Sequence, residues 1–93
     1  MKKELRILKA LSDETRLKIV EFLLGAEKCV CEIFPFVKRT QSTVSTQLDV
    51  LKKAGIVDSR KEGKKVYYFV VDKKVCNILK VLKNEQSEKS FCK

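Results

Sequence analysis

The fold is decided by residues 40–55, TQSTVSTQLDVLKKAG. Thr40 is suited to cap a helix N-terminus, because its hydroxyl can accept a backbone N–H that lacks an intrahelical partner. Gly55 is suited to the left-handed conformation that ends many helices. Between these ends, apolar residues recur at i, i+4, i+7 and i+10, which places them on one helical face: Val44, Leu48, Leu51 and Ala54. We therefore predict an amphipathic helix over this range.

The opposite face of this helix begins with uncharged side chains that form hydrogen bonds: Gln41, Ser42, Thr43, Ser45, Thr46 and Gln47. A helix in the DNA major groove reads base edges with such groups, from its first turns. A face that is merely solvated remains the alternative, although such a face usually carries Lys and Glu from its start. We predict a recognition helix, with Gln47 as the strongest base-reading candidate, because an amide can make a bidentate contact with adenine.

The upstream sequence predicts three more helices, over residues 2–11, over 14–24 and within 26–37. Pro35 is tolerated only near a helix start, so the third helix should begin late or be distorted. That helix and the recognition helix, joined by a tight turn, would form a helix-turn-helix.

Downstream, β-branched and aromatic residues predict two strands, over 56–60 and 65–71. Gly63 lies in the turn between them, where positive φ is needed. Asp72 can cap a last helix. The order of elements predicts a mainly α (α+β) winged helix-turn-helix: four helices, a two-stranded β-hairpin wing and a C-terminal helix. We expect one domain over residues 1–84 and a flexible polar tail over residues 85–93.

The charge balance favours a polyanionic partner. The 93 residues include 21 Lys and Arg against 12 Asp and Glu, a net charge of +9, and nucleic acid is the commonest partner for such a surface. We expect cations in the hairpin and in the turn before the recognition helix to contact phosphates: Lys38, Arg39, Arg60, Lys61, Lys64 and Lys65. Charge on a sheet edge also prevents strand-to-strand aggregation, and both roles can hold together.

Several function classes are disfavoured. No apolar run approaches the ~20 residues that span a bilayer, and the first residues do not resemble a signal peptide, so we expect a cytoplasmic protein with reduced cysteines. The chain contains no histidine. It shows no nucleophile paired with a base and no glycine-rich phosphate loop, so we expect no enzymatic activity.

Three stretches together resemble the ArsR/SmtB family of metal-responsive repressors. They are residues 11–19 (LSDETRLKI), residues 29–33 (CVCEI), and the DNA-reading half from residues 41–45 (QSTVS) through AGIV at 54–57 to Tyr67 and Tyr68. The resemblance implies a homodimer, formed through the first and last helices, that leaves operator DNA when metal binds. Two departures stand out. Asp72 lies near a family metal site in the last helix, but its histidine partners are absent. Phe34 stands where the arsenic-type motif has a third cysteine.

The cysteines are the candidate metal ligands. Thiolates are soft and select As(III), Cd(II), Pb(II), Hg(II) or Zn(II) over hard ions. Cys29 and Cys31 can chelate one ion, and we expect a helix N-terminus and Lys28 to lower their pKa. Cys92, in the tail, is our candidate third ligand, from either protomer, although it could also be an incidental thiol. Cys76 in the last helix is the other candidate for the third ligand, but its place beside the apolar stripe of that helix favours a small buried hydrophobe.

Two alternatives to metal-controlled repression stay open at this point. The first keeps DNA binding but replaces metal with cysteine oxidation, or with no effector. The second is a small thiol-rich metal-buffering or protein-interaction module whose basic charge is incidental. The polar first turns of the recognition helix and the basic hairpin disfavour this second alternative.

Overall fold

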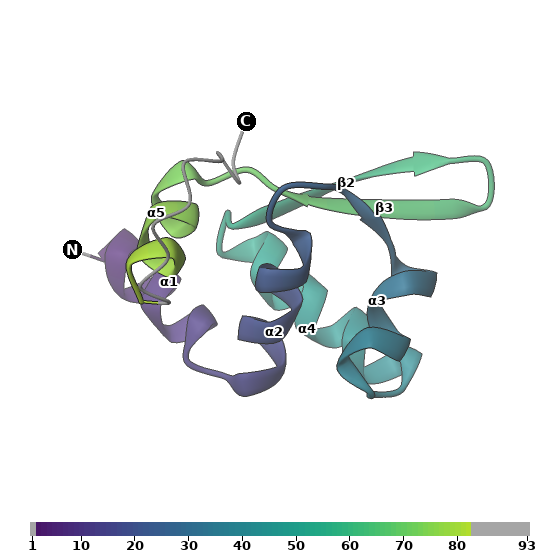
Figure 1. Cartoon of the computed structure of the whole chain (residues 1–93), viewed down its shortest axis with the longest axis horizontal. Coiled ribbons are helices and arrows are strands. Elements are labelled where there is room, and N and C mark those ends of the chain that lie inside the picture. The colour runs from purple at the N-terminus through teal and green to yellow at the C-terminus, as the bar shows by residue number, and fades with distance from the viewer. Residues whose placement is uncertain (1, 83–93) are drawn as a thin grey trace.

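The computed structural model describes residues 2–82 of the chain, and Figure 1 shows their arrangement. The elements, in chain order, are α1 (Lys2–Leu11), α2 (Glu14–Leu23), β1 (Lys28–Cys29), α3 (Val30–Val37), α4 (Gln41–Lys53), β2 (Val57–Glu62), β3 (Lys65–Val70) and α5 (Lys73–Leu82). The predicted winged helix-turn-helix is confirmed. The expected tail, residues 85–93, lies outside the described residues.

Helix α4 begins and ends as its sequence predicts. Thr40 is the N-cap, and its side chain accepts the backbone N–H of Thr43 at 3.2 Å. At the other end Gly55 has a φ of +79°. The N–H of Gly55 donates to the carbonyl of Lys52, and that of Ile56 to the carbonyl of Leu51. This pair of bonds is a Schellman motif, which satisfies carbonyls that the helix leaves unpaired.

The apolar stripe of α4 lies at the centre of the hydrophobic core. Val44, Leu48 and Leu51 are fully buried, and they pack in one cluster with Ile19 of α2 and Ile33 of α3. Burial of this stripe against two other helices fixes which face of α4 remains for solvent or a ligand. Figure 1 shows α1 and α5 at one end of the molecule, while the β2–β3 hairpin projects from the other.

The hairpin has a tighter turn than the four-residue turn that the sequence predicted. Glu62 pairs with Lys65, so only Gly63 and Lys64 lie between the strands. Gly63 has a φ of +62°, as a type II′ turn requires at its first position. The strands therefore extend to the tip, and they carry Lys61, Lys64 and Lys65 away from the body of the protein.

The structure corrects the expectation for the segment that contains the cysteine pair. Lys28 and Cys29 form a short strand that pairs with Tyr68 and Tyr67 of β3, so the sheet has three strands in the order β1–β3–β2. The sequence predicted only the two-stranded hairpin, because two residues are too few to show the alternation of a strand.

For the third helix the sequence left two alternatives open, a late start or a distortion at Pro35, and the late start is wrong. Helix α3 starts at Val30, directly after its N-cap, Cys29, and Pro35 lies inside the helix. Since proline has no N–H to donate to the carbonyl four residues earlier, the helix is weakened there. It ends two residues later at Val37, and Lys38 closes it in the left-handed conformation, with a φ of +59°. Pro35 therefore coincides with an early end of the helix and does not delay its start.

Candidate functional site

On the polar face of α4, some side chains form hydrogen bonds within the protein and others do not. Thr43 takes part in the N-cap, where its hydroxyl lies 3.0 Å from that of Thr40, and the hydroxyl of Thr46 donates to the carbonyl of Ser42 at 3.1 Å. Gln41, Ser42 and Ser45 are exposed. Within residues 2–82 their side chains make no hydrogen bond, so these three present free donors and acceptors to a ligand.

Gln47 is held by another helix. It is half-buried, and its Oε1 accepts a hydrogen bond from Nη1 of Arg16, at 2.6 Å. Arg16 also donates from Nε to the carbonyl of Ala10 at 2.7 Å. The guanidinium thus joins the end of α1 to the recognition helix. A bidentate contact with adenine needs the oxygen that Arg16 already occupies, so the base-reading role of Gln47 stays a prediction with a competitor inside the protein.

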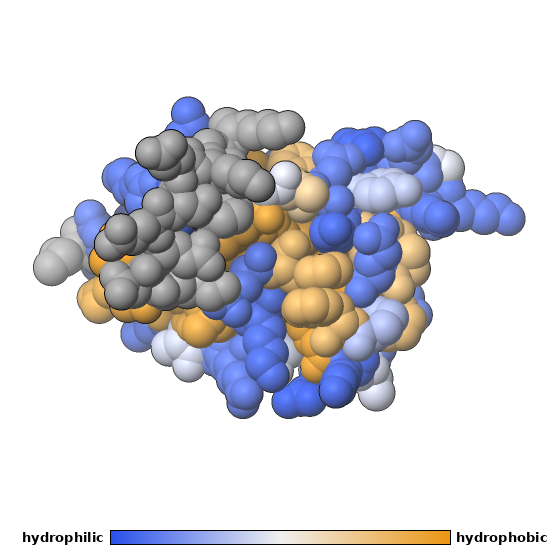
Figure 2. Space-filling view, viewed as in Figure 1, coloured by the Kyte–Doolittle hydropathy of each residue, from blue (hydrophilic) through white to orange (hydrophobic). Residues whose placement is uncertain are grey.

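The basic residues also differ in how free they are. Lys38, Arg39, Lys61, Lys64 and Lys65 are all exposed, and Figure 2 shows hydrophilic residues gathered over the projecting hairpin. Arg60 is instead partnered by two carboxylates. Its Nη1 donates to Glu62 at 2.6 Å, and its Nε donates to Glu27 at 2.9 Å. The hydrogen bond from Arg60 lowers the pKa of Glu27. The charge of Arg60 is therefore balanced within the protein.

The cysteine pair lies where β1 passes into α3. Cys29 is 3% exposed, and its Sγ accepts the backbone N–H of Cys31 at 3.2 Å as the helix cap. Cys31 lies on the exposed first turn. Both thiols are free. The pair therefore has one buried and one accessible sulfur, both close to the start of the helix-turn-helix.

The expected lowering of the pKa is wrong for Cys31. Its pKa is raised, chiefly by a hydrogen bond with the Cys29 thiol, with smaller contributions from burial and from the charges of Cys29 and Glu32. Only Lys65 opposes the shift among these causes. The physical reason is proximity, since ionising one of two adjacent thiols makes the second harder to ionise. A metal ion that displaces both protons removes this obstacle, because its own charge compensates both thiolates.

The described residues supply only part of a metal site. No group of three or more His, Cys, Asp or Glu is placed to hold an ion within residues 2–82. Cys76 is buried in α5, as predicted, but its sulfur is disulfide-bonded, which the interpretation as a small buried hydrophobe did not include. Cys92, the predicted third ligand, lies outside the described residues.

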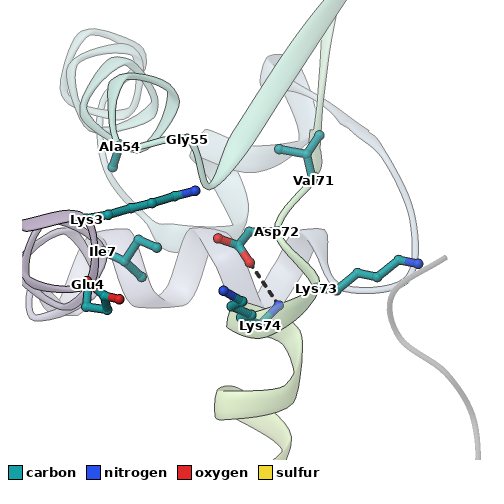
Figure 3. Close-up of a pocket in the computed structure, with 9 residues that line it drawn as sticks. All are labelled: Lys3, Glu4, Ile7, Ala54, Gly55, Val71, Asp72, Lys73 and Lys74. Carbon is teal, nitrogen blue, oxygen red and sulfur yellow. Dashed lines mark hydrogen bonds between the residues drawn. The ribbon is translucent and has the colours of Figure 1, made fainter. Parts of the chain in front are cut away.

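A pocket of about 420 Å³ lies away from the Cys29–Cys31 pair, between α1, the end of α4 and the start of α5 (Figure 3). Asp72 lines this pocket, and the Asp72 carboxylate accepts the backbone N–H of Lys74 at 2.9 Å. Three lysines also line the pocket: Lys3, Lys73 and Lys74. Glu4 lines the pocket as well, but the three lysines outnumber the two carboxylates. Asp72 therefore serves as a helix cap in a pocket of net positive charge, which does not favour a cation. No described helix is long and apolar enough to cross a membrane.

Comparisons with known proteins agree with this geometry. The family model "Bacterial regulatory protein, arsR family" matches residues 13–59. The cadmium resistance transcriptional regulatory protein CadC of Listeria innocua is 44% identical over 86% of this chain and 68% of its own length. An uncharacterized HTH-type transcriptional regulator of Methanocaldococcus jannaschii is also 44% identical, over 86% of this chain and 91% of its own.

Two solved structures are similar over most of the chain. HlyU from Vibrio cholerae has a TM-score of 0.85 and 32% identity, over 89% of this chain and 90% of that one. The homodimeric winged helix-turn-helix DNA-binding domain Mb0332 from Mycobacterium bovis has a TM-score of 0.77 and 26% identity, over 95% of this chain and 89% of that one.

Proposed function

This chain is a member of the ArsR family of bacterial regulatory proteins, and we propose that it is a dimeric repressor that a thiophilic metal or metalloid ion releases from operator DNA. The family and its relatives are transcriptional regulators. The proposal for the effector rests on one observation: two free thiols flank the start of the first helix of the helix-turn-helix. The relative named as a cadmium resistance regulator supports the same effector class.

In this proposal α4 lies in the major groove and the hairpin lies along the neighbouring phosphates. Gln41, Ser42 and Ser45 read base edges, because their side chains are exposed and free within residues 2–82. Phosphate contacts come from the exposed cations near both elements: Lys38, Arg39, Lys61, Lys64 and Lys65. Arg60 takes part only if a phosphate displaces one of its two carboxylate partners.

Substitutions at Gln41 and Gln47 should separate base reading from positioning. Gln41→Ala is expected to cost about 1–3 kcal/mol on the cognate operator and little on random DNA. Gln47→Ala also removes the contact with Arg16, so it should weaken binding to both DNAs alike. Competition binding assays with the two DNAs measure this difference. If Gln47→Ala lowered the affinity for the operator but not for random DNA, Gln47 would be a base-reading residue.

The metal would be held by Cys29 and Cys31, with Cys92 of the same or the other protomer as third ligand. Thiolate ligands favour As(III), Cd(II), Pb(II), Hg(II) or Zn(II). Release requires that the ion bind the DNA-free protein more tightly. By reciprocity, DNA must then weaken metal binding by the same factor, and couplings of this kind are typically about 5–150-fold.

The direct test is a metal titration of the reduced protein, followed through the ultraviolet thiolate-to-metal absorption band. The operator is first selected from a pool of random DNA. We expect a saturating band with Cd(II) or As(III), and a weaker apparent metal affinity when operator DNA is present. A titration that produces no band, or a metal affinity that is unchanged by DNA, would contradict the proposed function.

The dimer interface is proposed to run through α1 and α5. In α1 the structure buries Ile7, Ala10 and Leu11 and leaves Leu5 and Leu8 about half exposed. Val81 and Leu82 of α5 are still more exposed. A second copy that covers these side chains removes apolar surface from water. It would place the two recognition helices about 34 Å apart, on successive major grooves.

A lysine at this interface should dissociate the dimer. Leu8→Lys is expected to convert the protein to monomer at micromolar concentration, because it would bury a charge against apolar partners. Phe36→Lys is the matched control, since Phe36 of α3 is equally exposed, at 54%, but lies outside α1 and α5. Sedimentation velocity measures both variants. A wild-type monomer, or a Leu8→Lys dimer of unchanged stability, would count against this arrangement.

A further inference from the structure

The cysteine that caps α3 is also part of the wing sheet. Cys29 pairs with Tyr67 of β3, and Tyr67 pairs on its other side with Arg60 of β2. The three residues therefore form one row across the sheet. Directly opposed residues in antiparallel strands place their side chains on the same face, so the Cys29 thiol shares a face with the Tyr67 ring and the Arg60 guanidinium.

Arg60 makes contacts on this face of the sheet that connect the row to Glu27. The guanidinium of Arg60 lies over the Tyr67 ring, 4.9 Å from its centroid. It continues across the central strand to Glu27, which lies two residues before Cys29, and it also holds Glu62 on its own strand. Arg60 thus connects the outer strand of the wing to the segment that leads into the cysteine pair. We call this contact, Glu27–Arg60 over Tyr67, the wing latch.

Exposed ion pairs add little to stability, so folding alone is a weak reason for the latch. The latch connects β2 to the segment that leads into Cys29, so it can pass on a movement of that segment. Cys29 is buried, and its Sγ accepts the backbone N–H of Cys31. An ion that bonds to both sulfurs therefore has to open the cover over Cys29 and compete with this capping contact, which favours a shift of the chain there. Residues Lys28 and Cys29 form β1, which is hydrogen-bonded to β3 of the wing. Because the latch also joins Glu27 to Arg60 of β2, a shift of this segment acts on β2 as well.

From these contacts we infer that metal ligation acts on the wing directly, and that Glu27 is the positioning residue that transmits it through Arg60. This inference rests on the proposed metal-controlled function. Binding of the ion moves β1 against Tyr67, disturbs the latch and turns the wing cations away from the phosphates. The recognition helix need not be the first element to move.

The coupling factor, meaning the ratio of operator affinities without and with metal, tests the role of Glu27. Glu27→Gln is expected to bring this factor from its wild-type value, typically about 5–150, close to one, with the thiolate–metal band retained. Glu14→Gln is the matched control. It makes the same charge change at an exposed carboxylate, whose partner is Lys18 of the same helix, and should keep the wild-type factor.

A double substitution tests whether Glu27 acts through Arg60. Arg60→Ala should reduce the coupling factor as Glu27→Gln does, and the two together should have no larger effect than Arg60→Ala alone. A coupling factor that stays near the wild-type value in Arg60→Ala would show that Glu27 acts by another route and would overturn the latch.

Intrinsic fluorescence supplies an independent readout, because the chain has no tryptophan and only two tyrosines, which are adjacent in β3. In Tyr68→Phe the emission comes from Tyr67 alone. We expect Cd(II) to raise the quenching of this emission by acrylamide, in step with the thiolate–metal band, because the ring loses part of its cover. Tyr67→Phe leaves Tyr68 as the control, and its quenching should change less.

The outcomes separate the two levels of the proposal. A normal thiolate–metal band with normal DNA release, but an unchanged coupling factor in Glu27→Gln or unchanged quenching of Tyr67, overturns the wing latch and leaves the proposed function standing. Absence of the band in the wild-type protein overturns both.

Discussion

Serine at position 29 or 31 is expected to abolish metal-dependent release while the protein still binds its operator. A hydroxyl is a poor ligand for soft ions, so either change removes one of two obligatory thiolates. The fold should tolerate both. Serine is among the best N-cap residues and can replace Cys29 as acceptor for the N–H of Cys31, while Cys31 itself is exposed. The coupling factor should therefore fall from about 5–150 to about one.

The measurement is operator dissociation by As(III), Cd(II) and Hg(II), with each variant compared at equal DNA occupancy. Cys76→Ser, assayed like the other variants in the reduced protein so that the disulfide of Cys76 is open, is the control, since Cys76 is buried in α5 and has no assigned role as a ligand; it should release DNA as the wild type does. Cys92→Ser is expected to lower metal affinity without removing the response. If Cys29→Ser and Cys31→Ser released DNA normally, the pair would be structural or redox-active instead.

Operator affinity is expected to fall about 10³–10⁴-fold between 50 and 200 mM salt. A dimer that neutralises about six to eight phosphates has a log–log slope of roughly −5 to −7. Each protomer offers five exposed cations near the two DNA-contacting elements, Lys38, Arg39, Lys61, Lys64 and Lys65, so that number is within reach without Arg60. Binding isotherms at four or more salt concentrations give the slope.

Lys64→Ala tests the wing contribution to this slope. It should weaken binding to all sequences alike and flatten the slope by about 1 for each phosphate that the protein no longer neutralises. Lys18→Ala is the matched control, because Lys18 lies on α2 and pairs with Glu14 at 3.4 Å; its slope should equal that of the wild type. A change in sequence preference with no change in slope would contradict the wing assignment.

Local features of the sequence were sufficient for most of the elements and for choosing the thiol pair as candidate ligands. Thr40 and Gly55 mark the ends of α4 because capping involves hydrogen bonds within a few residues. Val44, Leu48 and Leu51 of the predicted apolar stripe are buried and Ala54 is partly buried, while Gly63 lies in the hairpin turn. Cys29 and Cys31 were chosen as candidate ligands from soft-ligand chemistry and from a family resemblance; the family match confirms the resemblance, and the ligand role stays a prediction.

Contacts between distant residues were decided only by the tertiary structure. Gln47 is occupied by Arg16, which lies 31 residues away, and Arg60 by Glu27, 33 residues away. Strand β1 exists only because β3 pairs with it. Nothing in the spacing of these residues predicts their pairing, since each contact depends on how helices and strands pack after they form. The sequence therefore identified the polar and charged side chains, but packing determined which of them remain free for DNA.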